Sequence, residues 1–212
     1  MELLEGIKNI IFDFGGVVIN IDYSRTEDAF RKLGITRFDE VYNQFRQTSV
    51  FDRFETGRID GQEFFNEIKK LVPPGVPEKK LRDAWNAMLL DFPEEHFNLL
   101  SELKRSYRTF LLSNTNEPHL EYYFGNIKSW YGLENMDPLF EKTYYSCRLG
   151  MRKPDTEIFE FVLKDSGLLP SETLFIDDSP QHLEGAGKCG IRVFHMKKPE
   201  TIISLFSMGL SG

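Results

Sequence analysis

The sequence has few cysteines and no run of basic residues, and both absences narrow the class of protein. Cys147 and Cys189 are the only cysteines among 212 residues. Two isolated cysteines are too few for a disulfide scaffold and lack the spacing of a zinc site, so we expect both to be reduced packing residues. The formal net charge is −7, and no dense Lys/Arg run offers the basic face that a nucleic-acid backbone needs. We therefore expect no nucleic acid as a partner.

The sequence also lacks a long apolar segment. Glu2 and Glu5 stand near the N-terminus in place of a basic segment, and the apolar run from Ile7 is interrupted by Asp13. This pattern fits neither a signal peptide nor a membrane span. We therefore expect a cytoplasmic protein with no membrane partner, while the sequence leaves the oligomeric state open.

Short apolar runs alternate with helix-like segments along much of the chain. The first run, residues 7–12, is rich in β-branched side chains and almost continuously apolar, which is typical of a strand buried on both faces of a parallel sheet. Similar runs follow at residues 109–112, 143–145, 173–176 and 192–194, and helix-like segments occur at 93–107, 155–166 and 179–189. This alternation predicts an α/β fold with a doubly wound, parallel, Rossmann-like sheet.

A long insertion follows the first predicted strand. Roughly seventy residues separate that strand from the helix-like segment that begins near Pro93, far more than a βα loop needs. Apolar side chains recur at helical spacing within residues 25–33, 38–47, 60–71 and 77–90. The sequence therefore predicts a helical cap domain over residues 19–92, inserted into a core made of residues 1–18 and 93–212.

Polar side chains follow three of the predicted strands. Asp13 ends the first strand, Ser113 and Asn114 end the second, and Asp177 and Asp178 end the fourth. The carboxyl ends of parallel strands meet at one edge of a sheet, where ligands bind in open α/β folds. We therefore predict that these side chains face one crevice.

Asp13 is followed by two glycines, which allow a sharp turn and a close approach of the backbone to a ligand. A carboxylate exposed at such a turn can act as a nucleophile or as a metal ligand. An isolated Asp before two glycines is more often a plain turn residue, however, and Ser113 and Asn114 have an equally ordinary interpretation as loop or helix-capping residues. Each of these signals is weak by itself.

Asp177 and Asp178 are adjacent carboxylates, which repel each other at a buried strand end unless a cation or hydrogen-bond donors compensate. Hard oxygen ligands without accompanying His or Cys pairs favour Mg²⁺ over zinc or copper.

Lys153 precedes a predicted helix and could offset phosphate charge, although an exposed lysine is usually solvated surface. His119 follows the second strand closely enough to reach the crevice, but no partner for its proton can be named, so we expect no catalytic role for it, nor for His182.

Four segments together resemble, in order and spacing, the four motifs of the haloacid dehalogenase superfamily. They are residues 12–17, 112–116, 149–154 and 175–178. The resemblance covers the whole chain and is nearest to bacterial α-glucose-1-phosphate phosphatases with a helical cap; the chain is also similar to the phosphatase domain of soluble epoxide hydrolases. It implies a magnesium-dependent phosphatase whose substrate is a small phosphomonoester, with sugar phosphates favoured and anomeric phosphates among them.

The resemblance also implies roles for individual residues. Asp13 would attack phosphorus and carry the phosphoryl group, and Lys153 would balance the charge on both. The implied catalytic residues are Asp13, Ser113, Asn114, Lys153 and Asp177. The implied Mg²⁺ ligands are Asp13, the Gly15 carbonyl and Asp178, with Asp177 in support, and no organic cofactor is implied.

The chain departs from most phosphatases of the superfamily at Gly15, where those enzymes carry a second Asp that protonates the leaving oxygen. Such proton transfer typically contributes ~10²–10⁴ in rate. One hypothesis is an anomeric substrate, whose leaving hydroxyl is more acidic; another is that His119 or a cap residue supplies the proton. In the cap, residues 51–58 are predicted to form a turn facing the crevice, where Arg53 and Arg58 either bind the substrate or simply lie in solvent.

Two other functions remain open. In a 2-haloacid dehalogenase, Asp13 would attack carbon without a metal, but Asp177 and Asp178 would then repel both Asp13 and a carboxylate substrate. A catalytically weak phosphate-binding module would follow from the missing acid at Gly15, although the nucleophile, the lysine and the metal carboxylates are all present.

Overall fold

The core of the protein is a five-stranded parallel sheet with the strand order β3-β2-β1-β4-β5. The computed structural model describes residues 3–35 and 49–207. The strands are β1 (Asn9–Phe12), β2 (Arg108–Ser113), β3 (Lys142–Tyr145), β4 (Thr173–Asp177) and β5 (Arg192–His195). The predicted α/β fold with a parallel, Rossmann-like sheet is confirmed, and each strand lies within two residues of its predicted position.

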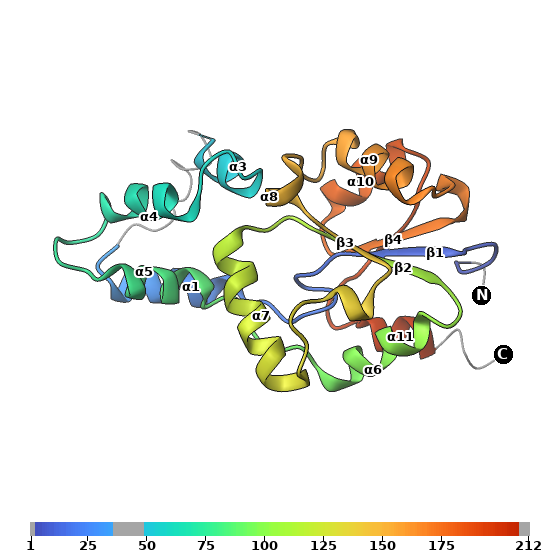
Figure 1. The fold of residues 1–212 in the computed structure, drawn as a ribbon, viewed down its shortest axis with the longest axis horizontal. Coiled ribbons are helices and arrows are strands. Elements are labelled where there is room, and N and C mark those ends of the chain that lie inside the picture. Colours follow the sequence, from blue (N-terminus) through green and yellow to red (C-terminus); the bar gives the residue numbers. More distant parts are fainter. Residues whose placement is uncertain (1–2, 36–48, 208–212) are drawn as a thin grey trace.

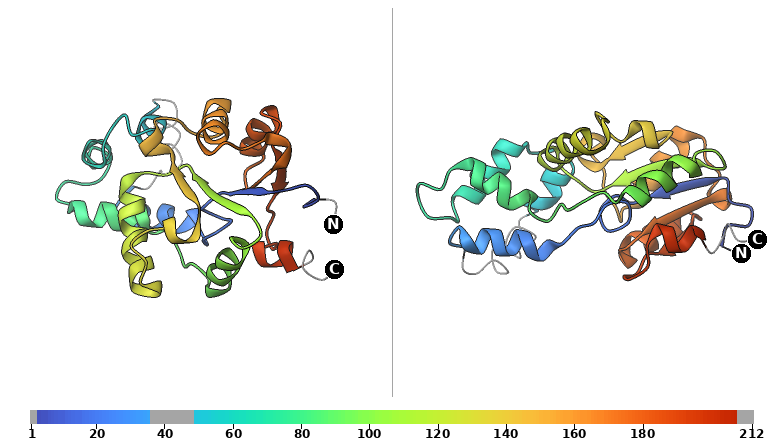
Figure 2. Two further views of the ribbon diagram at one scale, coloured as in Figure 1. Left: turned by 45° about the vertical axis from the view of Figure 1, so that its right-hand side comes forward. Right: turned by 90° about the horizontal axis from the view of Figure 1, so that it is seen from below.

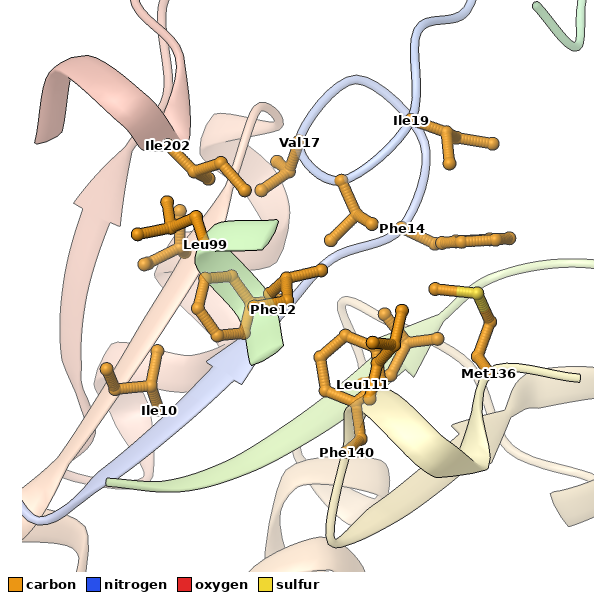
Figure 3. Packing of buried hydrophobic residues seen from close by; sticks show 14 of the residues in the cluster. Ile10, Phe12, Phe14, Val17, Ile19, Leu99, Leu111, Met136, Phe140 and Ile202 are labelled. Carbon is orange, nitrogen blue, oxygen red and sulfur yellow. The ribbon is translucent and has the colours of Figure 1, made fainter. Parts of the chain in front are cut away.

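Helices cover both faces of the sheet (Figure 1). One face carries α6 (Glu94–Leu103), α7 (Glu117–Tyr131) and α11 (Ile202–Ser207); the other carries α9 (Thr156–Ser166) and α10 (Pro180–Lys188). Because neighbouring side chains of a strand point to opposite faces, Ile10 and Phe12 of β1 pack with the first group, and Ile11 packs with the second. Figure 3 shows Phe12 among Leu99, Leu111 and Ile202. Residues 10–12 of the strand are all apolar because both of its faces are buried.

The register of the sheet brings the carboxyl ends of β1 and β4 next to each other. Central strand β1 pairs with β2 on one side and with β4 on the other, and Phe12 lies opposite both Leu111 and Ile176. The backbone N–H of Asp13 continues this ladder by donating to the Ile176 carbonyl, at 2.9 Å. The residues after Phe12 and Ile176 therefore emerge side by side.

Within the described residues, four helices form a separate layer beyond the strand ends, seen on the left in Figure 1. They are α1 (Tyr23–Lys32), α3 (Val50–Glu55), α4 (Gly61–Lys69) and α5 (Glu78–Asn86). These helices share an apolar cluster of their own, built around Phe54, Phe64 and Trp85. Two chain segments, which we call the waist, join this layer to the sheet (Figure 2).

The waist consists of two chain segments that run side by side. Asn20 and Leu90 are joined by a hydrogen bond from the Leu90 N–H to the Asn20 carbonyl, at 3.0 Å, and an antiparallel bridge pairs Ile21 with Leu89. The insertion therefore leaves and re-enters the core at neighbouring points.

The helical expectations for the insertion are met in part. The predicted helices over residues 25–33 and 60–71 correspond to α1 and α4, whereas the one over 77–90 is shorter, since α5 ends at Asn86. The predicted helix over residues 38–47 lies outside the described residues. Residues 51–58, expected as a turn, begin as helix α3 and turn only after Glu55.

No helix in the described part of the chain has both the length and the apolar character needed to cross a membrane. Both cysteines are free and partly buried.

Candidate active site

Three carboxylates meet where β1 and β4 end. One oxygen of each of Asp13, Asp177 and Asp178 lies within 4.8 Å of the others. Asp13 and Asp177 are buried, while Asp178 lies at the rim. The two aspartates expected to share an ion are therefore brought together.

The turn after β1 passes against Asp178 because Gly16 has no side chain. Gly16 has φ +80°, and a Cβ at this position would lie 2.4 Å from Asp178 Oδ2. Its N–H donates to the Ile19 carbonyl, at 2.8 Å, and closes the turn. Phe14 and Val17 anchor the turn in the apolar core, as Figure 3 shows. Gly16 is thus required by both its backbone conformation and its close neighbour.

Lys153 lies at the centre of the cluster. Its side chain is 0% exposed, and Nζ donates to Asp13 Oδ1 at 2.7 Å, to Asp177 Oδ2 at 2.7 Å and to the Leu112 carbonyl at 3.0 Å. These three acceptors use all three ammonium hydrogens. Burial alone would lower the pKa of Lys153, but Asp13 and Asp177 outweigh it and raise the pKa, so the ammonium stays charged. Lys153 is therefore not solvated surface.

Asp177 is the most fully bonded of the three carboxylates. Besides Lys153, it accepts from the Ser179 N–H at 2.7 Å and from His182 Nδ1, which lies 3.0 Å from both oxygens. Burial opposes ionisation of Asp177, but Lys153 and His182 outweigh it and lower the pKa to about 2. Asp177 lies behind the cavity wall and holds Lys153 and His182 in place.

His182, a residue without a predicted role, is thus part of the site. It lies in the first turn of α10, five residues after Asp177. The nearest signal in the sequence is that short spacing between a strand-end Asp and a His on the following helix, and it becomes informative only once Asp177 is known to be buried.

Asp13 and Asp178 retain uncompensated negative charge. Burial raises the pKa of Asp13 to about 7, with a further contribution from Asp177 and an opposing one from Lys153. Burial, followed by the charge of Asp177, also raises the pKa of Asp178. A cation placed between these two carboxylates would restore their ordinary acidity.

Ser113 and Asn114 end β2 beside the cluster. The Asn114 side chain accepts from the Lys153 N–H and donates to the Lys153 carbonyl, both at 2.9 Å. It therefore positions Lys153 and keeps one amide hydrogen for a ligand. The Ser113 hydroxyl makes only a long contact of 3.5 Å, with the Asn114 carbonyl, so it can turn toward an anion.

A cavity of about 870 Å³ lies between the strand ends and the cap. The predicted site residues that line it are Asp13, Gly15, Ser113, Asn114, Lys153 and Asp178. From the cap side, Glu27, Asp52, Glu55 and Trp85 reach it. Arg53 and Arg58, which the sequence offered as substrate ligands, are exposed and do not line the cavity, in line with the alternative that they lie in solvent.

His119 joins the cap to the core. Its ring stacks on Trp85, with centroids 5.0 Å apart and planes at 16°. Nε2 lies 3.3 Å from the Trp85 carbonyl and Nδ1 lies 3.2 Å from Asn116 Nδ2, so the partners assign the proton to Nε2. Burial lowers the pKa of His119 to about 4, which leaves it neutral at pH 7. With both ring nitrogens engaged, His119 is poorly suited to deliver a proton.

A second junction lies on the other side of the cavity. Arg152, next to Lys153 in the chain, forms ion pairs with Asp52 and, at 3.0 Å, with Glu55 of α3. Beside it, a Cβ at Gly57 would lie 2.1 Å from the Cys147 carbonyl, so the end of α3 packs closely on α8 (Ser146–Leu149). The cap thus touches the core at both rims of the cavity.

Comparison with known proteins assigns the chain to a family. Residues 7–190 match the family model for haloacid dehalogenase-like hydrolases. A D-ribitol-5-phosphate phosphatase of Bacteroides thetaiotaomicron is 34% identical over 188 residues, which cover 89% of this chain and 91% of that protein.

Solved structures agree over nearly the whole chain. A HAD family enzyme of Bacteroides thetaiotaomicron, solved with magnesium and inorganic phosphate, is 36% identical with a TM-score of 0.86, covering 94% of this chain and 99% of that one. A predicted HAD-like family hydrolase of Porphyromonas gingivalis is 30% identical with a TM-score of 0.85, covering 97% and 98%. The chain therefore belongs to the haloacid dehalogenase-like hydrolases.

Proposed function

We propose that the chain is a magnesium-dependent phosphatase that hydrolyses small phosphomonoesters through an aspartyl phosphate on Asp13. The observation that carries the proposal is the buried contact of Lys153 with Asp13 and Asp177, beside Asp178 and at the base of a cavity of about 870 Å³. The phosphatase name of the 34% identical relative and the magnesium and phosphate bound in the 36% identical structure support it.

The residues at the strand ends fit a magnesium ion. Asp13, the Gly15 carbonyl and Asp178 are the groups that would hold it, because Asp177 is already engaged by Lys153, Ser179 and His182. Oxygen ligands without cysteine are the donor set that Mg²⁺ prefers. When bound, the ion would stabilise negative charge on the transferring phosphoryl group.

The protein groups have separate parts in the proposed reaction. Lys153 fixes Asp13 Oδ1, and the Asp13 carboxylate attacks phosphorus with its other oxygen as the bond to the leaving oxygen breaks. Lys153, Ser113 and the remaining Asn114 hydrogen stabilise charge on the phosphoryl oxygens. Water then attacks the aspartyl phosphate, which releases phosphate and restores Asp13.

Gly15 cannot supply the leaving-group proton, and the neutral, doubly bonded His119 does not favour the His119 hypothesis. The anomeric-substrate and cap-residue hypotheses remain predictions. A series of phosphomonoesters with leaving groups of different acidity separates them. A rate that rises steeply with leaving-group acidity supports the first, and a flat dependence indicates a proton donor in the cap.

We further propose that residues 19–92 are the cap domain and that residues 1–18 and 93–212 are the catalytic core. The separate apolar cluster of the cap helices and the waist near Asn20 and Leu90 support this division. The substrate class we favour is a sugar or polyol phosphate, since the 34% identical relative is a D-ribitol-5-phosphate phosphatase. The anomeric phosphates implied by the sequence resemblance stay within that class.

The alternative of a 2-haloacid dehalogenase is less well supported, because three clustered carboxylates would repel a carboxylate substrate. A phosphate-binding module without catalysis would retain a buried Lys153 and an ionisable Asp13 that it does not need.

The deciding assay is hydrolysis of p-nitrophenyl phosphate with Mg²⁺ and with EDTA. We expect hydrolysis only with Mg²⁺, and a loss of more than about 10³-fold in Asp13→Asn, which removes the nucleophile. Chloride release from 2-haloacids would instead indicate the dehalogenase. Phosphate binding without any turnover would indicate the binding module.

A further inference from the structure

The cap end of the cavity is lined by carboxylates. At the strand ends, the Ser113 hydroxyl and one amide hydrogen of Asn114 are available to a phosphate, and the buried charge of Lys153 lies beside them. At the cap, Glu27, Asp52 and Glu55 line the wall. The end of the substrate that bears no phosphate therefore meets three carboxylates.

Within the described residues, the one arginine that lines the cavity is already committed. Arg152 pairs with both Asp52 and Glu55, so its single positive charge is shared between two carboxylates. Lys153 is likewise shared by Asp13 and Asp177. The cap end of the described cavity thus offers no uncompensated cation to a second anionic group.

Glu55 is held in a defined position within this wall. Its Oε2 is buried without a hydrogen bond and forms an ion pair with Arg152 Nη2, at 3.0 Å. Its Oε1 forms no hydrogen bond among the described residues, although 28% of the side chain remains exposed. Burial raises the pKa of Glu55, while the charges of Arg152 and Lys153 act to lower it. Glu55 is therefore close enough to Lys153 for the two charges to interact.

These contacts discriminate between two kinds of substrate. A hydroxyl can donate a hydrogen bond to the open oxygen of Glu55, whereas a carboxylate or a second phosphate has no hydrogen to donate and is repelled by Glu55 and Asp52. A partly buried carboxylate that loses a hydrogen bond, or that faces a like charge, selects against the wrong ligand.

We infer that Glu55, held by Arg152, is a specificity-determining residue that accepts a hydrogen bond from a hydroxyl at the non-phosphate end of the substrate and rejects substrates that carry a second anionic group there. This inference rests on the proposed phosphatase function and names the substrate class of that site: hydroxylated, otherwise uncharged phosphomonoesters.

The first test uses the unaltered enzyme and two substrates that differ only at that end. Glycerol 3-phosphate ends in CH₂OH, and 3-phosphoglycerate ends in a carboxylate. We expect kcat/KM to favour glycerol 3-phosphate by at least about tenfold. A five-carbon pair, ribitol 5-phosphate and ribonate 5-phosphate, repeats the comparison. Equal or reversed values in both pairs overturn the inference.

The second test assigns the selection to Glu55. Glu55→Gln keeps the shape and the hydrogen-bond acceptor but removes the charge, so we expect the ratio of the two kcat/KM values to fall at least about threefold, mainly through tighter binding of the acid substrate. Glu67→Gln removes the same charge from an exposed site on α4 that does not line the cavity, and should leave the ratio unchanged. An unchanged ratio in Glu55→Gln, or an equal change in both variants, removes Glu55 from the role.

Failure of the inference is distinguishable from failure of the proposed function. Hydrolysis of p-nitrophenyl phosphate by the unaltered enzyme reports the phosphatase itself, and its absence defeats both. Hydrolysis of that compound with equal rates on the paired substrates defeats only the inference. If Glu55→Gln gives no cooperative thermal unfolding, the ratio in the unaltered enzyme still tests the substrate class.

Discussion

The core wall and the cap wall of the cavity hold their charged groups in different ways. In the core, Lys153 is 0% exposed and makes three hydrogen bonds that link two strand ends. In the cap, Arg152 also pairs with two carboxylates, but it is partly exposed and its partner Asp52 is 59% exposed. Because solvent screens the cap ion pairs and not the core ion pairs, we expect the core pairs to contribute more to stability.

The largest predicted effect follows from removing the buried cation. Lys153→Met leaves Asp13 and Asp177 facing each other without compensation, so we expect the free energy of unfolding to fall by about 3–5 kcal/mol and phosphatase activity to be lost. Urea unfolding and p-nitrophenyl phosphate hydrolysis measure the two effects. Lys128→Met, at an exposed pair with Glu134, is the control and should change stability by less than about 0.5 kcal/mol. Equal effects in the two variants would remove the contrast between buried and exposed pairs.

The turn after β1 gives the next largest effect. Gly16→Ala forces a side chain to φ +80° and to within 2.4 Å of Asp178 Oδ2, so we expect a loss of about 2–3 kcal/mol in stability and weaker Mg²⁺ activation. Gly125→Ala is the matched control, because it lies inside α7 with no atom within 4 Å of the added Cβ. That change should stabilise the protein by about 0.5–1 kcal/mol. A destabilised Gly125→Ala, or an unaffected Gly16→Ala, would contradict the role of the close approach.

The cap junction should respond to pH. Burial lowers the pKa of His119 from 6.5 to about 4, so between these values the unfolded chain binds a proton more readily than the folded one. The free energy of unfolding is therefore unaffected by His119 above pH 6.5 and falls as the pH drops toward 4. We expect a fall of about 1–3 kcal/mol. The smaller value is favoured because His119 lines the cavity. His119→Phe keeps the stacking on Trp85 and removes the titration. Urea unfolding at pH 7.5 and 4.5 should show a smaller loss in this variant; an identical loss in both proteins would disprove the assignment.

The smallest effect is expected at the exposed end of the cap wall. Asp52→Asn removes one of the two partners of Arg152 but leaves Glu55, so we expect stability to change by less than about 0.5 kcal/mol. Thermal unfolding in low salt and in 0.5 M NaCl should show that even this difference shrinks with screening. A loss comparable to that of Lys153→Met would mean that the cap wall is as rigid as the core wall.

The core could be predicted from the sequence because its strands are buried on both faces. Residues 10–12 and 174–176 are apolar, and the parallel order then brings Asp13 and Asp177 to one edge. Helix α7 was not predicted: its buried side chains, Leu120, Tyr123 and Ile127, alternate with exposed aromatic residues such as Trp130, which obscures the helical period.

The remaining parts of the site depend on tertiary packing. Helix α3 has six residues, too few to show a periodic pattern, and the choice of Glu55 over Arg53 as the cavity-facing residue follows only from how α3 packs on α8. His182 likewise becomes a partner of Asp177 only when α10 folds back beside β4. These contacts between distant parts of the chain cannot be predicted from local sequence.

The paired strands of the waist give the molecule a modular character. Since Asn20 and Asp91 are hydrogen-bonded to each other, we expect that a tight reverse turn could replace the insertion and leave β1 paired with β2 and β4. Such a trimmed chain would keep its carboxylate cluster and its lysine while losing its choice of substrate. The core would thus determine reactivity, and the insertion would determine selectivity.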